Sequence, residues 1–561
     1  MPQGSNVESA HLFDARARSR VLDQVSSDMF DLVVVGGGIN GAGVAHDAAL
    51  RGLRPLLLEQ RDLAFGTSSR SSKLIHGGLR YLEHYQFKLV FEGTNERAVL
   101  RHIAPHLVRP LLFALPVYEG ARHPLWMVDV GLWMYDSLSL FKVEKRHITL
   151  RSSKRMLEHE PLLRSDAMTG GIIYYDCMTD DARLTLENAL AASELGAPIL
   201  TRARVVRIEG LKGPGPGPVR VTFQDLLSER FYTVMAKGVV NCTGPWTDAT
   251  RRAARIEGSV LRPTKGVHIV LKHERLPVHH ANALVAPQDG RVFFVIPWRG
   301  RSVIGTTDTD FEGSPDELSV TKDDVAYLLE AANHFFPSCG LKTDDVLAAW
   351  VGLRPLIAAA DAESESDVPR EHKLFVDGRM LTIAGGKLTT YRRMVAEAVN
   401  AYADLVGLRV GPTRTARAML PGARDLGSNI DDFAAKLAER APLSRTIVDR
   451  LVHVYGARAR DVVAYATDDA SLRDRICPDV DAIYAEVAHA VDCELALSID
   501  DVLIRRTSLA LLAADQGLSA VGRVADLMAE RLGWSAATRD LNIAQYRHAV
   551  SLTRVFRQGE C

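Results

Sequence analysis

The stretch Phe30-Asp-Leu-Val-Val-Val-Gly-Gly-Gly-Ile-Asn-Gly41 decides the fold, because an apolar, β-branched run leads straight into a glycine-rich turn. A second apolar run, Arg54-Pro-Leu-Leu-Leu-Glu59, follows and ends on a carboxylate. Two buried strands with a helix between them have this length and pattern. The strand, turn, helix and acidic residue together predict a Rossmann-like dinucleotide-binding unit, whereas a glycine motif alone would be weak evidence.

The residue types of this unit suit a dinucleotide. Gly36 permits the tight turn, Gly38 lets the backbone approach a pyrophosphate, and Gly41 lets the helix lie close to the strand. The N-terminus of the helix presents unpaired N–H groups and a partial positive charge to the diphosphate. Glu59 can accept hydrogen bonds from the hydroxyl groups of an adenosine ribose.

The next segment favours FAD over NAD as the dinucleotide. Residues 66–81 are Gly-Thr-Ser-Ser-Arg-Ser-Ser-Lys-Leu-Ile-His-Gly-Gly-Leu-Arg-Tyr, which is rich in hydroxyl groups and glycine. Such a loop suits an extended cofactor that is held along its pyrophosphate and ribityl chain. A solvated polar loop would explain Ser68 to Ser72, but it would not explain the apolar and glycine residues of 74–78.

The segment Ser71 to Glu83 resembles the signature of the FAD-dependent glycerol-3-phosphate dehydrogenase family. Further blocks of that family follow in the same order: Asp180-Asp-Ala-Arg-Leu184, Asn241-Cys-Thr-Gly-Pro-Trp246, Lys265-Gly-Val-His268, Ile304-Gly-Thr-Thr-Asp308, Gly352-Leu-Arg-Pro-Leu356 and Gly385-Gly-Lys-Leu-Thr-Thr-Tyr391. The resemblance is strong over residues 28–410 and weaker beyond, through Asp501-Val-Leu-Ile-Arg-Arg-Thr507. Two features depart from the family. Cys242 replaces its usual alanine, and residues 1–27 extend beyond the usual bacterial start.

The predicted fold is of the α/β (α+β) class. A Rossmann-like FAD-binding domain is joined to an antiparallel-sheet substrate domain, similar to D-amino-acid oxidase and glutathione reductase, and to an all-helical C-terminal cap. Short alternating strands dominate the middle of the chain, and helical periodicity replaces them from about residue 413. The predicted parts are an N-terminal extension at 1–27, the FAD-binding domain at 28–110 with 170–265 and 345–412, the substrate-binding domain at 111–169 with 266–344, and the helical domain at 413–561.

The resemblance also implies which residues contact FAD. They are Gly36, Gly37, Gly38, Asn40, Gly41, Glu59, Ser68, Ser72, Lys73, Leu74, His76, Val206, Thr243, Gly244, Gly386, Lys387, Leu388 and Thr389. Lys387 should precede a helix, where its charge and the helix N-terminus would stabilise the negative charge of a reduced flavin near N1 and O2. The alternative for Lys387 is a helix-capping surface lysine.

Three arginines are implied as substrate contacts: Arg80, Arg354 and Arg370. A guanidinium group bonds phosphate oxygens in pairs and does not lose its charge, so it suits a phosphorylated alcohol. The alternatives are an ion pair with a structural carboxylate for Arg354 and a solvated surface position for Arg370. Tyr81 either donates a hydrogen bond to the substrate or packs in the core.

His268 is the candidate catalytic base. A neutral imidazole can accept the proton of the C2 hydroxyl near neutral pH. The hypothesis is that His268 and Arg354 together favour the alkoxide as hydride leaves, with Lys387 as the third catalytic residue. The alternatives are a structural histidine with satisfied hydrogen bonds, or one that only orients the substrate.

Composition excludes several classes of protein. The 561 residues are 47% apolar and 24% charged, as in a soluble globular protein, and a net charge of −1 gives no general attraction to nucleic acid. The six cysteines, at 177, 242, 339, 477, 493 and 561, include no CxxC pair. This argues against a disulfide framework and a zinc site, predicts no metal, and fits a reducing cytoplasm.

Membrane contact is expected to be peripheral, at the inner face of the cell membrane. The N-terminus has no apolar signal region, and no apolar stretch approaches the ~20 residues that span a bilayer. This expectation rests on the lipid-soluble quinone that the resemblance implies as electron acceptor. Residues 124–141, followed by Lys142, Lys145, Arg146 and His147, form either an interfacial helix or a buried amphipathic one.

The resemblance implies oxidation of sn-glycerol 3-phosphate to dihydroxyacetone phosphate, with hydride passed to FAD and electrons to quinone. Three alternatives stay open: an oxidase of the same substrate that uses oxygen, another FAD-dependent amine or amino-acid oxidase, and a non-catalytic flavin-binding scaffold. An amino-acid oxidase usually grips a carboxylate with one arginine, so several cations favour phosphate. The oligomeric state, including a homodimer, also stays open.

Overall fold

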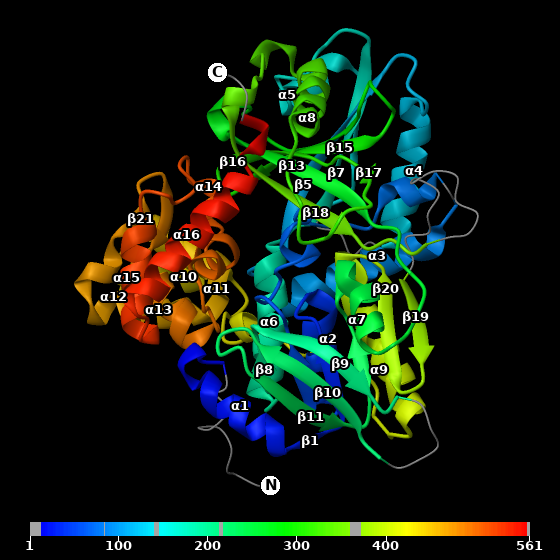
Figure 1. Cartoon of the computed structure of the whole chain (residues 1–561). Coiled ribbons are helices and arrows are strands. Elements are labelled where there is room, and N and C mark those ends of the chain that lie inside the picture. The colour runs from blue at the N-terminus through cyan, green and yellow to red at the C-terminus, as the bar shows by residue number, and fades with distance from the viewer. Residues whose placement is uncertain (1–12, 84, 140–144, 212–216, 359–371, 558–561) are drawn as a thin grey trace.

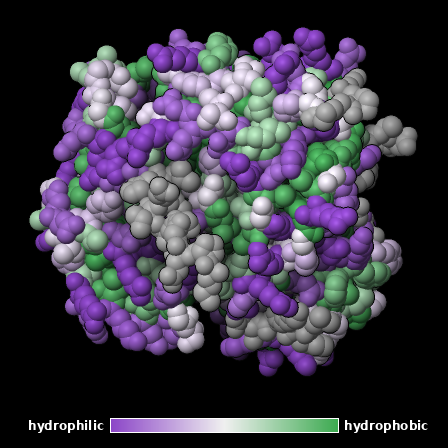
Figure 2. Space-filling view, turned by 90° about the horizontal axis from the view of Figure 1, so that it is seen from below, coloured by the Kyte–Doolittle hydropathy of each residue, from purple (hydrophilic) through white to green (hydrophobic). Residues whose placement is uncertain are grey.

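The computed structural model describes residues 13–83, 85–139, 145–211, 217–358 and 372–557. Two β-sheet regions are stacked one above the other, and a helical lobe made by the C-terminal part of the chain lies beside them (Figure 1). Seen from below, the left half of the surface is mostly hydrophilic and hydrophobic side chains gather in patches toward the right (Figure 2).

The lower region contains the predicted βαβ unit. Its sheet has the order β19-β20-β12-β2-β3-β8, with β2 (Leu32–Val35), β3 (Pro55–Leu58), β8 (Ile199–Leu200), β12 (Val239–Asn241), β19 (His372–Asp377) and β20 (Met380–Gly385). The pairs are parallel except for β19 with β20, and β2 and β3 are buried along their whole length. The Rossmann-like prediction is therefore confirmed.

Helices and a smaller sheet cover this core. The helices are α2 (Ile39–Leu50), α6 (Asp181–Glu194) and α9 (Tyr391–Val406), and the small sheet has the order β1-β11-β10-β9, with β1 (Met29–Phe30), β9 (Ala203–Glu209), β10 (Val219–Asp225) and β11 (Phe231–Ala236). In the N-terminal extension, α1 (Arg18–Ser27) buries Val21, Leu22 and Val25 in the same core cluster as the small sheet. The described part of the extension thus belongs to the folded unit.

The upper region is built on a mainly antiparallel, ten-stranded sheet. Its strands are β4 (Leu74–Ile75), β5 (Arg109–Tyr118), β6 (Ile148–Leu150), β7 (Met168–Met178), β13 (Thr264–Lys272), β14 (Ala281–Val285), β15 (Val292–Trp298), β16 (Arg301–Gly305), β17 (Thr309–Asp310) and β18 (Val346–Arg354). Beside it lie α3 (Phe87–Ile103), α4 (Leu125–Leu138), α5 (Ser153–His159) and α8 (Lys322–Phe335). The domain limits drawn from the sequence remain a prediction; β7 and β18 fall mostly in ranges predicted for the FAD-binding domain, yet they pair within this sheet.

The C-terminal domain is helical, as predicted, apart from one short hairpin. Its elements are α10 (Ile430–Ala438), α11 (Arg445–Tyr455), α12 (Ala459–Asp468), α13 (Tyr484–Cys493), the π-helix η14 (Asp501–Arg506), α14 (Leu509–Leu512), α15 (Val521–Leu532) and α16 (Ala536–Leu552). The hairpin joins β21 (Arg475–Cys477) to β22 (Val480–Ile483) through Pro478-Asp479, a turn-forming pair. Among the described residues, no helix combines the length and apolar character needed to cross a membrane.

Candidate active site

A cavity of about 340 Å³ opens where the lower sheet meets its loops. Its size falls within the range of small-molecule and cofactor sites. Ten residues predicted for FAD line it: Gly36, Gly38, Asn40, Glu59, Ser68, Thr243, Gly244, Gly386, Lys387 and Leu388. The cavity thus joins the first βαβ unit to the turn between β20 and α9.

Two glycines of the first turn are required by their surroundings. Gly36 has φ +104°, and a Cβ atom there would lie 2.7 Å from the carbonyl oxygen of Cys242. A Cβ atom on Gly41 would lie 1.8 Å from the carbonyl oxygen of Gly36. Any side chain at either position would push α2 away from β2 and β12, so these glycines set the close approach of helix and sheet.

Glu59 is buried at one end of the cavity and is held by the backbone. Its carboxylate accepts hydrogen bonds from the N–H groups of Gly37 at 2.6 Å and Arg61 at 2.7 Å. Burial raises the pKa of the carboxyl group, and these two hydrogen bonds oppose the rise. Each carboxylate oxygen keeps further lone pairs, so the group can also accept from ribose hydroxyls.

The N-terminus of α2 faces the cavity with polar groups suited to a diphosphate. The Ile39 N–H donates to the Ser68 hydroxyl at 2.9 Å. The buried Asn40 side-chain oxygen has no hydrogen-bond partner among the described residues, although Asn40 lines the cavity. A buried polar atom of this kind fits a hydrogen bond to a bound ligand or water. The acid at one end, the helix N-terminus and the glycine turn near Lys387 fit FAD along its length.

The other residues predicted for FAD lie around the cavity rather than in its lining. Lys73 is buried and donates to Asp181 at 2.7 Å and to the Ser69 carbonyl at 3.1 Å. Leu74 is buried in β4. The His76 N–H donates to the Thr389 hydroxyl at 3.2 Å. Val206 follows Ala203, Arg204 and Val205, which line the cavity.

His268 lies on β13, and its two ring nitrogens have different surroundings. Its Nε2 lies 2.8 Å from the Ser72 hydroxyl, and its ring stacks on Trp350 with centroids 4.8 Å apart. Nδ1 is buried and has no hydrogen-bond partner among the described residues. Burial, followed by the charges of Arg354 and Lys73, holds the pKa of His268 well below 6.5. The imidazole is therefore neutral at pH 7.

Arg354 ends β18, the neighbour of β13. Its guanidinium group donates to Asp308 at 2.7 Å and to the Thr306 hydroxyl at 2.9 Å. A Cβ atom on Gly266 would lie 2.7 Å from Arg354 Nη2, so this glycine makes room for the arginine. The ion pair with a carboxylate, one of the alternatives drawn from the sequence, is thus present, and it orients the guanidinium group beside β13.

Lys387 and Tyr81 lie together, although they are 306 residues apart in sequence. The Lys387 ammonium group is 3.4 Å from the centre of the Tyr81 ring, a cation–π contact. Arg80 belongs to the 3-10 helix η4 (Leu79–Leu82), but its side chain is outside the described part of the structure. Arg370 also lies outside the described residues.

Several residues of this site were not singled out from the sequence. Phe65, Trp246, Pro355 and Met394 line the cavity, and the rings of Phe65 and Trp246 are 6.3 Å apart. Trp246 closes the block that begins at Asn241, and this position was the available signal. No local pattern marks Trp350 as the partner of His268, because the two residues meet only through strand register.

Family models match most of the chain. A model described as FAD dependent oxidoreductase matches residues 31–392, and one described as the C-terminal domain of alpha-glycerophosphate oxidase matches residues 413–539. The chain is 36% identical over 545 residues to glycerol-3-phosphate dehydrogenase of Synechocystis sp., covering 94% of this chain and 97% of the relative. It is 35% identical over 543 residues to aerobic glycerol-3-phosphate dehydrogenase of Bacillus subtilis, covering 94% and 96%.

Two solved structures resemble this chain to different degrees. The glycerol-3-phosphate dehydrogenase from Bacillus halodurans, complexed with FAD, superposes with a TM-score of 0.81 at 31% identity, covering 96% of this chain and 98% of its own. The L-alpha-glycerophosphate oxidase from Mycoplasma pneumoniae has a TM-score of 0.51 at 18% identity, over 69% of this chain and 97% of its own. At that identity the second likeness shows the fold alone.

Proposed function

This chain belongs to the FAD-dependent glycerol-3-phosphate dehydrogenase family, and we propose that it oxidises sn-glycerol 3-phosphate to dihydroxyacetone phosphate and passes the electrons to a membrane quinone. One observation carries the proposal. The wall of the cavity includes Ser71 and Pro355, each adjacent in sequence to a group that connects it to the proposed substrate site. Those groups are Ser72, which is bonded to His268, and Arg354.

Bound FAD would accept the hydride from C2 of the substrate. The chain is proposed to supply the proton acceptor and the positive charges that bind the substrate phosphate. His268 is neutral, and in the tautomer whose Nε2–H donates to Ser72 the lone pair lies on Nδ1, which has no partner among the described residues and is proposed to take the C2 hydroxyl proton. Ser72 and the stacked Trp350 hold the ring in place. Losing the proton as hydride leaves turns the alcohol into the ketone.

Cations near His268 suit a phosphorylated substrate. Arg354, positioned by Asp308, provides a guanidinium fork, and Arg80 and Arg370 are proposed as further phosphate contacts. Tyr81 and Lys387, in contact with each other, are proposed to border the same site from the α9 side. A single carboxylate would need fewer cations, so this set favours phosphate over an amino acid.

Anaerobic titration of the purified protein tests the substrate and the cofactor together. We expect sn-glycerol 3-phosphate to bleach the yellow flavin absorbance, and glycerol at the same concentration to leave it unchanged. A colourless protein that takes up no flavin, or equal bleaching by an amino acid, would refute the proposal. Supplying a soluble quinone analogue or oxygen to the reduced protein then identifies the acceptor, since the oxygen alternative requires stoichiometric hydrogen peroxide.

An exposed apolar face supports the proposal that the acceptor is reached at a membrane. On α4, Trp126 is 65% exposed, Val130 54% and Trp133 47%, and these residues share one helix face. The side chain of Arg122, just before the helix, is 78% exposed, and Arg146 lies 5.6 Å from the Trp133 ring. Aromatic and aliphatic side chains bordered by cations suit insertion among anionic lipid headgroups.

A further inference from the structure

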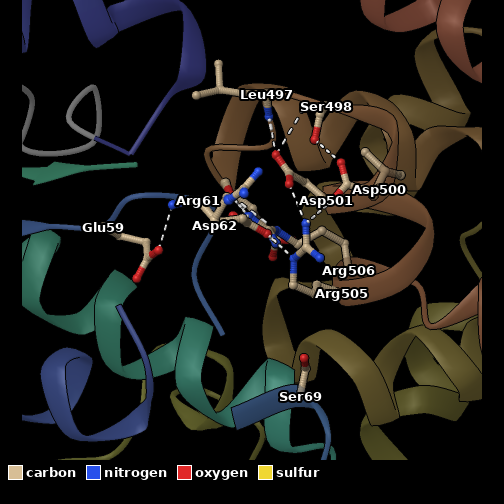
Figure 3. A network of polar contacts seen from close by, with 12 residues as sticks. Glu59, Arg61, Asp62, Ser69, Leu497, Ser498, Asp500, Asp501, Arg505 and Arg506 are labelled. Atoms are coloured by element: carbon tan, nitrogen blue, oxygen red, sulfur yellow. Dashed lines mark hydrogen bonds and ion pairs between the residues drawn. The ribbon is translucent and has the colours of Figure 1, made fainter. Parts of the chain in front are cut away.

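A buried network of charges joins the C-terminal domain to the loop that carries Glu59. Figure 3 shows the network, with the carboxylate of Asp62 facing the guanidinium groups of Arg505 and Arg506. Asp62 and the two arginines are separated by 443 and 444 residues in sequence and are almost fully buried. Both arginines lie in the π-helix η14, an irregular helix type that is frequent at functional sites.

The Asp62 carboxylate forms ion pairs with two arginines. Arg506 donates to its two carboxylate oxygens at 2.7 and 2.9 Å, and Arg505 donates at 2.5 Å. Burial raises the pKa of Asp62, but the two guanidinium groups outweigh this effect and hold it below its ordinary value. The carboxyl group is therefore ionised at neutral pH, and removing one partner would leave buried charge only partly compensated.

The backbone connects the ion-paired Asp62 to the cofactor cavity. Asp62 follows Arg61, whose N–H donates to Glu59 at 2.7 Å. Three residues after Asp62, Phe65 lines the cavity and has the Arg505 guanidinium group 5.6 Å from its ring. Holding Asp62 in place therefore also holds the Arg61 N–H group, which orients Glu59. It holds Phe65 as well, which forms an aromatic wall of the same cavity.

A second ion pair connects the same π-helix to Arg202, whose backbone is hydrogen-bonded to this loop. Arg202 bonds Asp501 at 2.7 and 2.8 Å, and its backbone N–H donates to the Arg61 carbonyl at 3.0 Å. The next residue, Ala203, donates its N–H to the Glu59 carbonyl at 2.8 Å and lines the cavity. The loop 59–62 is therefore held by two sets of ion pairs, and residues of η14 take part in both.

We propose that Arg505 and Arg506 are positioning residues for the adenosine end of FAD. Through Asp62 and Asp501, the C-terminal domain holds Glu59 and the cavity wall in the conformation that binds ribose, so this domain sets the affinity for the cofactor. The inference rests on the proposed function, because it takes FAD as the ligand. It assigns a role to a domain that contributes none of the residues lining the cavity in the described part of the chain.

The test uses flavin fluorescence to measure the binding of FAD and of FMN to the apo-protein, and it compares the two Kd values. FMN lacks the adenosine half, so it does not engage Glu59. We expect Arg506→Gln to raise the Kd for FAD by about tenfold or more and the Kd for FMN by less than about twofold. Arg506→Lys keeps one ion pair with Asp62 and should recover part of the loss.

The matched control is Arg450→Gln. Arg450 is a mostly buried arginine of the same domain that pairs with Glu486 at 2.7 Å and does not contact the loop 59–62. We expect its Kd for FAD to equal that of the wild type. If Arg506→Gln does not fold by circular dichroism, the double variant Asp62→Asn/Arg506→Gln replaces both charged partners and should fold while still binding FAD about tenfold more weakly.

Several outcomes would overturn the inference. They are an unchanged Kd for FAD in the folded single or double variant, an equal loss for FAD and FMN, an equal loss in Arg450→Gln, and failure of both variants to fold, which would give the network a purely structural role. Failure of the proposed function would look different, because the wild-type protein would then bind no FAD or its bound flavin would not be bleached selectively by sn-glycerol 3-phosphate.

Discussion

At the scale of single residues, the neighbours of His268 distinguish its two ring nitrogens for the proposed proton transfer. A Cβ atom on Gly305 would lie 2.2 Å from His268 Cδ2, so only glycine leaves room for the ring on that side. Trp350 covers one face, and the Ser72 hydroxyl occupies Nε2. These contacts leave Nδ1 as the nitrogen without a described partner.

We predict that His268→Gln lowers kcat by about 10²- to 10⁴-fold, because that is the usual contribution of a general base. FAD content, measured from the flavin absorbance, should not change, since His268 does not line the cofactor cavity. His279→Gln, which replaces an exposed histidine, is the control and should keep wild-type turnover. Full turnover in His268→Gln would remove this residue from the proton-transfer step.

At the scale of elements, α4 has one buried face and one exposed apolar face. Leu132, Tyr135 and Asp136 are buried on its inner face. The opposite face is apolar but exposed, with Trp126 and Trp133 prominent. Such a face suits contact with another surface, and because cations border it we propose an anionic bilayer as that surface.

We predict that Trp126→Asp and Trp133→Asp each weaken binding to vesicles with anionic headgroups by about tenfold, from the apolar area lost to the membrane. Co-sedimentation with vesicles measures this effect. Activity with a soluble quinone analogue should stay at the wild-type level. Phe231→Asp is the control, because Phe231 is also 65% exposed but lies on β11. If Phe231→Asp weakened binding as much as the α4 variants, α4 would not be the docking face.

At the scale of the whole molecule, buried neutral histidines link stability to pH. Burial lowers the pKa of His46 to about 4, of His106 to about 3 and of His489 to about 3. For His106 the nearby charge of Arg183 adds to the effect of burial. In the unfolded chain these groups have a pKa of about 6.5, so below that pH unfolding takes up protons and the folded state loses stability.

We predict that His106→Gln gains stability relative to the wild type as the pH falls below about 6.5, by up to about 1.4 kcal/mol per pH unit. Above pH 7 the difference between the two proteins should be constant, because the histidine is neutral in both states. Urea unfolding at pH 7.5, 6 and 5 measures the difference. Parallel profiles for the wild type and the variant would contradict this prediction, because the pKa of His106 would then be the same in the folded and the unfolded protein.

Much of the fold could be predicted from the local pattern of apolar and glycine residues in the sequence. The apolar runs before Gly36 and before Glu59 form β2 and β3, and the periodicity after residue 413 forms the helical domain. The glycine turn and the acid both line the cavity, as expected. These features are local because strand alternation, helix periodicity and the requirement for glycine depend on residues close in sequence.

The sequence by itself determined the class of fold and the cofactor, and it predicted Glu59, His268 and Arg354 as site residues. Tertiary structure alone decided the partners of these groups: Ser72 for His268, Asp308 for Arg354, and Arg506 for Asp62. The last pair spans 444 residues, and no local preference encodes such a contact. The physical reason is that a buried charge needs an opposite charge at hydrogen-bond distance, and only closure of the whole chain brings one there.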